Sequence, residues 1–472
     1  MTTECNQRSF QFHPHFSRDV VGSFDGGTIT SDGGSLLLRE VERRTGILGQ
    51  FAECFTDHRN PALIEHSVLD LVSQRVYGLA LGYEDLNDHD DLRRDPLLAT
   101  LVGKNDPTGA KRLNPADAGK PLAGKSTLNR LELTPSDAGA GSRYKKITID
   151  EEAVDRMLLN VFIQRHRKAP KRIVLDLDAT DDPIHGQQEG RFFHGYYNNY
   201  RYLPLYIFAG DDLLCARLRQ SNIDASAGTV EELERIVTHL RAKWPSVKIV
   251  IRADSGFARE EIMTWCEMNR VDYVLGLAKN DRLIKLLSRE MRRARGQFEK
   301  TDRTTRVFRD FRYRTLDSWR CRRRVIGKAE YMQNGPNPRF IVTSIPKDEI
   351  DARALYEDEY CARGEMENRI KEQQLQLFAD RTSSHTMRAN QIRLWFSSVA
   401  YTLMQALRRL GLRGTSMARA QCATIRLKLL KIGARVRVTV RKIWVSLAGG
   451  YPYAEIFAQV YENLRASQLS SS

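Results

Sequence analysis

The sequence has 472 residues, of which 41% are hydrophobic and 28% are charged, and this composition is typical of a folded protein with about two to four domains. No apolar run is long enough to span a membrane and no signal peptide is recognisable, which predicts a soluble intracellular protein. Seven scattered cysteines without a CxxC pair argue against a disulfide framework or a cysteine zinc site.

The first 150 residues are predicted to form a mostly helical domain. Residues 1–20 have the composition of a poorly ordered arm. Apolar residues recur at helical spacing over 62–81, with Asn60 as the N-cap. The segment 135–142 (PSDAGAGS) is typical of a linker.

The pattern changes after a predicted helix over 151–167. Strands and helices then follow in the order β-β-β-α-β-α-β, which predicts a mixed sheet covered by helices over 151–300. The predicted strands are 172–178, 203–209, 213–218, 248–253 and 271–277, and the helices are 229–243 and 260–269. A β-rich, strongly basic insertion is expected over 301–348, and a long helix dominates 349–385.

Positive charge is concentrated in the last predicted domain, 386–472. The segment from Arg381 to Ala454 contains 14 Lys or Arg and no Asp or Glu, so it accounts for nearly all of the net charge of +15. Arg435, Arg437 and Arg441 lie in a stretch where charged residues alternate with valine, which favours a strand. An excess of this kind predicts a polyanionic partner, most simply nucleic acid.

Carboxylates at strand ends suggest a metal site. Asp176 and Asp178 are two residues apart and therefore face the same side of their strand. Asp254 ends the strand 248–253, and Glu367 lies on the predicted helix after the insertion. Oxygen ligands without Cys or His favour Mg²⁺ or Mn²⁺, and two such ions suit phosphodiester chemistry.

Two other motifs carry less weight. Residues 119–126 (GKPLAGKS) match a P-loop, but no apolar strand precedes them, so no nucleotide cofactor is expected; Lys125 and Arg130 are instead candidates for contact with DNA phosphate. His185 and His194 have no zinc-site spacing.

The helix after the insertion aligns Arg363, Glu367 and Lys371 on one face, with Tyr360 one turn earlier. This spacing is compatible with a metal ligand beside a DNA phosphate. It is equally compatible with an ordinary surface ladder of ion pairs.

Taken together, these motifs resemble those of bacterial DDE transposases of the insertion-sequence-1380 group. The strand order, with Asp on the first strand, Asp after the fourth and Glu on a helix after an insertion, is similar to their RNase H-like core. Tyr360, Arg363 and Glu367 resemble the Tyr-x2-Arg-x3-Glu signature of one large branch. Segments that resemble the group are FDGGTITSDGG, AGKSTLNRLE, LDLDATDDPIHGQQEGRFFHGYY, RADSGFAREE and YCARGEMENRIKEQQ.

The resemblance implies a catalytic triad of Asp178, Asp254 and Glu367 that holds two Mg²⁺ or Mn²⁺ ions, with Asp176 left open as the alternative first ligand. Tyr360 and Arg363 would contact the phosphates of the transposon end. The branch signature has Lys seven residues after Glu, where this sequence has Gln374, and Lys371 is the candidate substitute.

The resemblance further implies cleavage at transposon ends and transfer of the 3′-OH to target DNA by a homodimer in the bacterial cytoplasm, associated with the nucleoid. The N-terminal domain would read the inverted repeat, and the C-terminal domain would contact DNA or dimerise. Further candidate DNA contacts are Arg322, Arg323 and Arg324. A nuclease without strand transfer, an inactive DNA-binding regulator and a P-loop NTPase remain alternatives.

Overall fold

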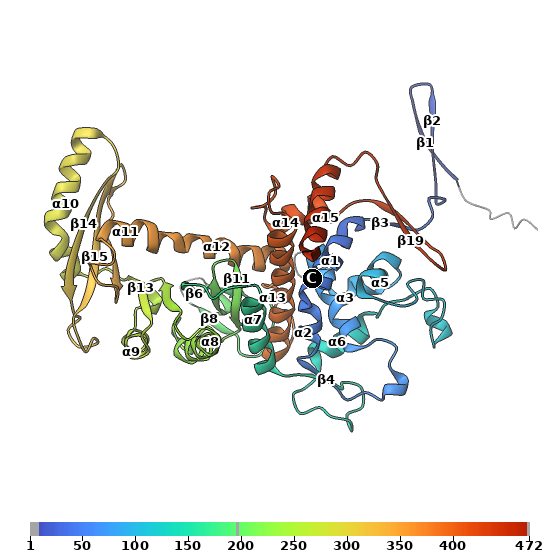
Figure 1. Ribbon diagram of the computed structural model, residues 1–472, viewed down its shortest axis with the longest axis horizontal. Coiled ribbons are helices and arrows are strands. Elements are labelled where there is room, and N and C mark those ends of the chain that lie inside the picture. The colour runs from blue at the N-terminus through green and yellow to red at the C-terminus, as the bar shows by residue number, and fades with distance from the viewer. Residues whose placement is uncertain (1–8, 195–197, 470–472) are drawn as a thin grey trace, which may run out of the picture. The chain divides into compact units, whose positions relative to one another are not determined.

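The computed structural model describes residues 9–194 and 198–469 (Figure 1). The chain divides into two compact units: the central unit, 151–398, and the terminal unit, which combines the chain up to residue 150 with the chain from 399 onwards. The sequence predicts separate first and last domains, but the structure groups most of them in one unit. No described helix is long and apolar enough to cross a membrane.

The central unit is built around a nine-stranded mixed sheet in the order β11-β10-β6-β12-β13-β17-β15-β14, with β16 paired to β15. β6, β12 and β13 are parallel, and the remaining pairs are antiparallel. The strands are β6 (Arg172–Ala179), β10 (Leu205–Ala209), β11 (Asp212–Arg217), β12 (Lys248–Ala253), β13 (Asp272–Leu277), β14 (Thr305–Tyr313), β15 (Arg323–Met332), β16 (Gly335–Pro336) and β17 (Arg339–Thr343). A smaller sheet contains β7 (Asp182–Pro183), β9 (Asn199–Tyr202) and β8 (Phe192–His194). The mixed α/β fold expected from the sequence is therefore present.

Helices cover both faces of this sheet (Figure 1). Ile173, Leu175 and Leu177 of β6 belong to the core under α7 (Glu151–Gln164), α8 (Thr229–Lys243) and α9 (Glu260–Met268). Val174 faces the opposite core, which contains Leu355 and Tyr356 of the long helix after the insertion. Because side chains alternate along a strand, Asp176 and Asp178 face the long helix.

The β-rich insertion extends the central sheet rather than forming a separate domain. β17 pairs with β13, and β15 and β14 follow. The helix α10 (Asp281–Thr301), which the sequence analysis missed, buries Leu283, Leu287 and Ala294 against β14 and β15.

The long helix after the insertion changes its winding near the predicted site. It comprises α11 (Ala352–Ala354), the π-helical η6 (Leu355–Tyr360), the 3₁₀ turn η7 (Cys361–Arg363), α12 (Gly364–Lys371) and the π-helical η8 (Glu372–Gln376). Such π-helical turns often occur at functional sites. α13 (Met387–Leu410) follows.

The terminal unit is mostly helical, as expected. Its α-helices are α1 (Leu36–Thr45), α2 (Ile47–Ala52), α3 (Val68–Leu81), α4 (His89–Leu92), α5 (Pro96–Val102), α6 (Lys125–Leu133), α14 (Cys422–Ile425) and α15 (Ala454–Leu469). Its small sheets are β19-β18-β3, from β19 (Ile443–Leu447), β18 (Ala434–Val438) and β3 (Ile29–Thr30), and β4-β5, from β4 (Phe55–Asp57) and β5 (Ile147–Ile149).

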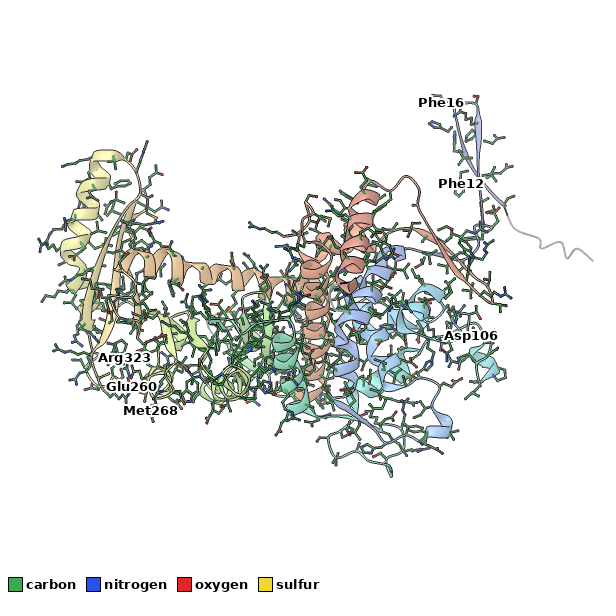
Figure 2. All side chains as sticks on the ribbon, viewed as in Figure 1. Phe12, Phe16, Asp106, Glu260, Met268 and Arg323 are labelled. Atoms are coloured by element: carbon green, nitrogen blue, oxygen red, sulfur yellow. The ribbon has the colours of Figure 1, made fainter. Side chains whose placement is uncertain are left out.

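The described part of the predicted N-terminal arm is a β-hairpin, so the expectation of an irregular segment is wrong there. β1 (Ser9–His15) pairs with β2 (Arg18–Ser23). Phe12 and Phe16 are labelled on this hairpin in Figure 2 and are 61% and 91% exposed. Phe10 and Phe12 alternate with polar residues, which is the pattern of a strand, although all residues of β1 are exposed in the structure.

Candidate active site

The first strand of the central sheet carries two carboxylates with different surroundings. Asp176 is buried and lies directly opposite Arg252 in the parallel register of β6 and β12. Arg252 donates from Nε to Asp176 Oδ1 at 2.5 Å and from Nη2 to Oδ2 at 2.8 Å. Burial raises the pKa of Asp176, and the guanidinium opposes that rise. Asp176 is therefore held in a bidentate ion pair.

Asp178 is joined to Glu367 through Arg363. The guanidinium of Arg363 donates to Asp178 Oδ1 at 3.1 Å and to Glu367 Oε1 at 2.6 Å. The side chain of Asp178 is 16% exposed and that of Glu367 is 48% exposed, so Glu367 lies at the open side of the group. The i,i+4 pair expected from the sequence is therefore part of a larger cluster that includes a carboxylate from β6.

Asp254 lies at the end of β12 and completes the group. One of its carboxylate oxygens accepts a hydrogen bond from the backbone N–H of Gly256 at 2.8 Å, which fixes the turn after the strand. Its charge acts on both Asp178 and Arg363. The cluster thus brings together the three residues predicted as the triad, without Asp176.

A glycine missed by the sequence analysis makes room beside Asp254. A Cβ at Gly276 of β13 would lie 2.6 Å from the Tyr360 hydroxyl and 2.8 Å from the backbone nitrogen of Ser255. The approach of Tyr360 therefore requires glycine at this position. A glycine inside the apolar run VDYVLGL was the available signal in the sequence.

Burial raises the pKa of Asp178 to about 6. Arg363 lowers this pKa, while Asp254 and Glu367 raise it further because their negative charges disfavour ionisation of a third carboxyl group. A carboxylate that is costly to ionise in the free protein provides a strong reason for this cluster to bind a cation.

We expect Asp178→Asn to stabilise the central unit above pH 6. Because the folded-state pKa of Asp178 is raised from 3.8 to about 6, its destabilising contribution is absent below pH 4 and complete above pH 6. The shift predicts a gain of about 2–3 kcal/mol for Asp178→Asn at pH 8 and none at pH 4. Melting curves of the two proteins across this pH range measure the difference, with the exposed Glu365→Gln as control. A lower stability of Asp178→Asn at pH 8 would contradict the assignment.

The cluster fits a divalent cation by its chemistry but is not arranged around one. Among the described residues, no group of three or more His, Cys, Asp or Glu side chains is preassembled for a metal ion. Arg363 instead interacts with all three carboxylates, and its Nε is buried without a hydrogen-bond partner. Three carboxylates match the oxygen ligands that Mg²⁺ and Mn²⁺ prefer, provided that Arg363 moves aside.

The three consecutive arginines of the insertion differ in exposure. Arg323 is buried and paired with Glu260 and Glu267 of α9 (Figure 2). Arg324 is buried against Asp310. Both guanidinium groups form buried ion pairs within the central unit. Of the three predicted DNA contacts, only Arg322 is exposed.

Lys371 and Gln374, the two residues after Glu367 considered for the role of the signature lysine, have different surroundings. Lys371 is exposed, as a phosphate-binding lysine requires. Gln374 donates to the backbone oxygen of Asp181 at 3.3 Å, so it helps to hold the loop after β6.

The segment that matches a P-loop is not arranged to bind phosphate. Only a 3₁₀ turn, η4 (Pro115–Asp117), lies between α5 and α6, so no strand leads into it. The backbone nitrogen of Lys125 donates to Asp90 at 3.1 Å, which places a carboxylate at the N-terminus of α6. Lys125 and Arg130 remain accessible on this helix, at an exposed and a half-buried position.

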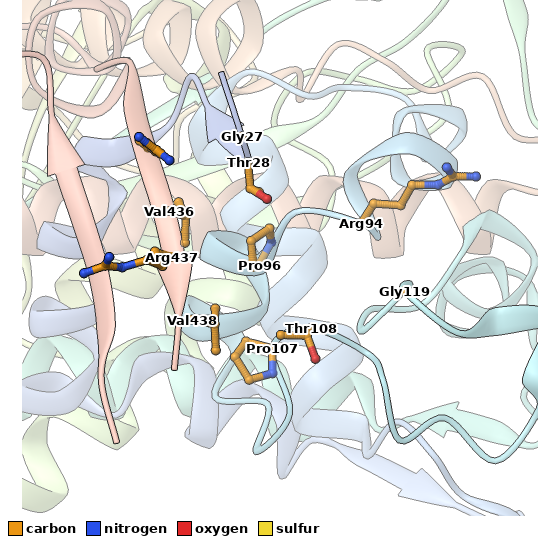
Figure 3. Close-up of a pocket in the computed structure, with 11 residues that line it drawn as sticks. Gly27, Thr28, Arg94, Pro96, Pro107, Thr108, Gly119, Val436, Arg437 and Val438 are labelled. Carbon is orange, nitrogen blue, oxygen red and sulfur yellow. The ribbon is translucent and has the colours of Figure 1, made fainter. Parts of the chain in front are cut away.

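A second candidate site is a cavity of about 490 Å³ in the terminal unit (Figure 3). It is lined by residues from the segment before β3, from the loops around α5 and from β18. Arg94, Arg435 and Arg437 are among the residues that line it, and in Figure 3 the guanidinium groups of Arg94 and Arg437 extend away from the prolines and valines of the lining. Arg441 lies on the turn beyond β18 and is exposed.

Of the two histidines, His185 is exposed in a loop, and the side chain of His194 lies outside the described residues.

The family model described as transposase DDE domain group 1 matches residues 12–469. No curated protein matches the chain.

Proposed function

Because the chain belongs to the family of transposase DDE domain group 1 and is therefore a DNA transposase, we propose that it cuts DNA at the ends of an insertion sequence and joins the freed 3′-OH groups to target DNA. The observation that carries this proposal is the convergence of Asp178, Asp254 and Glu367 on Arg363. The order β11-β10-β6-β12-β13, with one antiparallel hairpin followed by parallel strands, supports an RNase H-like core. We assign the chain to the insertion-sequence-1380 group on the motifs quoted above.

Asp178, Asp254 and Glu367 are the residues that would hold divalent cations, which DDE transposases generally use. When bound, such ions activate the attacking oxygen and stabilise the leaving oxygen in phosphodiester chemistry. Asp176 is excluded from this proposed set because Arg252 occupies both of its oxygens.

The remaining residues of the site position DNA. In the free protein, Arg363 neutralises Asp178 and Glu367, and a DNA phosphate offers the same guanidinium an alternative anion. The Tyr360 hydroxyl, held beside Gly276, is available to donate to a phosphate of the transposon end. Lys371, Arg322, Lys125 and Arg130 are proposed to contact the DNA backbone.

The terminal unit is proposed to read the inverted repeat, with Arg435, Arg437 and Arg441 among its contacts. Two transposon ends must be joined in one event, so we propose a homodimer on DNA that acts in the bacterial cytoplasm at the nucleoid.

The test uses a labelled duplex that carries the terminal inverted repeat, together with a supercoiled target plasmid and Mg²⁺ or Mn²⁺. We expect cleavage at the transposon end and covalent joining of the cut 3′ end to the plasmid. Cleavage without joining favours a nuclease. Specific binding without cleavage favours an inactive regulator, and either result contradicts the proposal.

A further inference from the structure

The β18–β19 hairpin has two chemically different faces. In its antiparallel register Arg437 lies opposite Trp444 and Arg435 lies opposite Ser446, so these four side chains share one face. The other face contains Ala434 and Val436, which are buried in the terminal unit. The hairpin is therefore anchored by its apolar face and presents its basic face outward.

The cations of the outward face and the turn have no acidic partner. Within the part of the chain that the structure describes, no ion pair is found for Arg435, Arg437, Arg441 or Lys442. The surrounding segment from Arg381 to Ala454 contains no Asp or Glu, so none is close in sequence. Unpaired cations this close together repel one another and favour an external polyanion.

An exposed aromatic residue lies among these charges. Trp444 is 47% exposed, with Arg437 Cζ at 5.9 Å and Lys442 Nζ at 5.2 Å from the centre of its ring. Val440 at the turn is fully exposed. The cavity of Figure 3 lies beside the same strand, and the exposed Arg94 is among the residues that line it, with its guanidinium pointing away from β18.

We propose that the β18–β19 hairpin is a DNA-contact ribbon whose turn, residues 439–442, enters a groove of the duplex while Arg435 and Arg437 lie against the phosphates. The inference rests on the transposase function proposed above and adds the mode of contact. The major groove of B-DNA admits a two-stranded ribbon. Trp444 would then be covered by the sugar–phosphate backbone.

Salt dependence measures the phosphate contacts. Binding of a duplex of about three helical turns is compared for wild type and for the triple variant Arg435→Gln, Arg437→Gln, Arg441→Gln, from low to moderate salt. Each phosphate contact adds about 0.9 to the slope of log affinity against log salt, and the proposal places Arg435 and Arg437 on phosphates. We therefore expect the slope to become shallower by about 2. The matched control neutralises Lys111, Arg143 and Lys145, three exposed cations of the same unit, and keeps a slope closer to wild type.

Quenching of Trp444 gives a second readout that needs no cleavage. Of the five tryptophans, Trp244, Trp319 and Trp395 are buried and Trp265 is half-buried, so Trp444 is the most accessible to acrylamide. The variant Trp444→Phe identifies its share of the signal and leaves that of Trp265 unchanged. We expect DNA to protect the share of Trp444 and polyglutamate to leave it accessible.

The outcomes separate the two proposals. A wild-type protein that binds no DNA overturns the proposed function and the ribbon together. DNA binding with an unchanged slope in the triple variant and an unprotected Trp444 overturns the ribbon alone. Equal protection by polyglutamate replaces DNA with an acidic protein as the partner.

Discussion

Asp178→Asn, Asp254→Asn and Glu367→Gln are each expected to slow cleavage of a transposon end by at least about a thousandfold. Each substitution keeps the shape of the side chain and removes one negative charge from the cluster around Arg363. The loss of a carboxylate weakens attraction for a divalent cation and frees Arg363 from one of its partners. Rates of end cleavage and the affinity for Mn²⁺, measured separately, check both effects.

Glu365→Gln is the matched control for this series. Glu365 is exposed on the same helix, two residues before Glu367, and is not among the carboxylates that act on Arg363. We expect it to cleave and to bind Mn²⁺ like wild type. If Glu365→Gln is inactive and Glu367→Gln is active, the third member of the triad has been misassigned.

The local sequence was sufficient to place the strands of the core. The apolar run before Asp178 and the run before Asp254 both predict buried strands, and the structure has β6 and β12 there. What the sequence could not provide was the lateral register. Arg252 lies opposite Asp176 only because β6 and β12 pair in parallel with this alignment. For this reason, the strand pattern alone could not decide between Asp176 and Asp178, and only the resemblance to the family favoured Asp178.

The same limit applies to the basic insertion. The sequence alone does not distinguish Arg322, Arg323 and Arg324, yet in the structure only Arg322 is exposed. The carboxylates that pair with Arg323 lie on α9, which is distant from it in the sequence. Long-range ion pairs of this kind leave no local pattern, so a cluster of arginines overpredicts DNA contacts.

The helix α10 was missed for a different reason. It is dense in charge, and its buried residues Leu283, Leu287 and Ala294 form a narrow stripe. A helix that packs on a sheet through one stripe has low overall hydrophobicity, and the sequence analysis predicts no element for this segment.

Arg252→Met is expected to destabilise the central unit by about 3–5 kcal/mol, because it leaves the buried carboxylate of Asp176 without its counterion. Arg252 also donates to the backbone oxygen of Glu359 at 2.5 Å, and Glu359 directly precedes Tyr360. The pair thus connects β6 and β12 to the helix that carries Arg363 and Glu367. Denaturant unfolding at pH 8 measures the loss. The loss shrinks as the pH falls, because burial raises the pKa of Asp176 and protonation removes its unpaired charge.

The double variant Arg252→Met, Asp176→Leu separates an ion pair that supports the fold from a metal ligand. Removing both charges leaves no unpaired carboxylate, so we expect it to recover much of the stability lost in Arg252→Met. If Asp176 has only a positioning role, the double variant also retains Mn²⁺ affinity. The variant Asp178→Asn, in contrast, stays folded but loses Mn²⁺ affinity. A double variant that folds well but no longer binds Mn²⁺ would make Asp176 a ligand, and the bidentate pair with Arg252 would then be a resting arrangement that the cation has to displace.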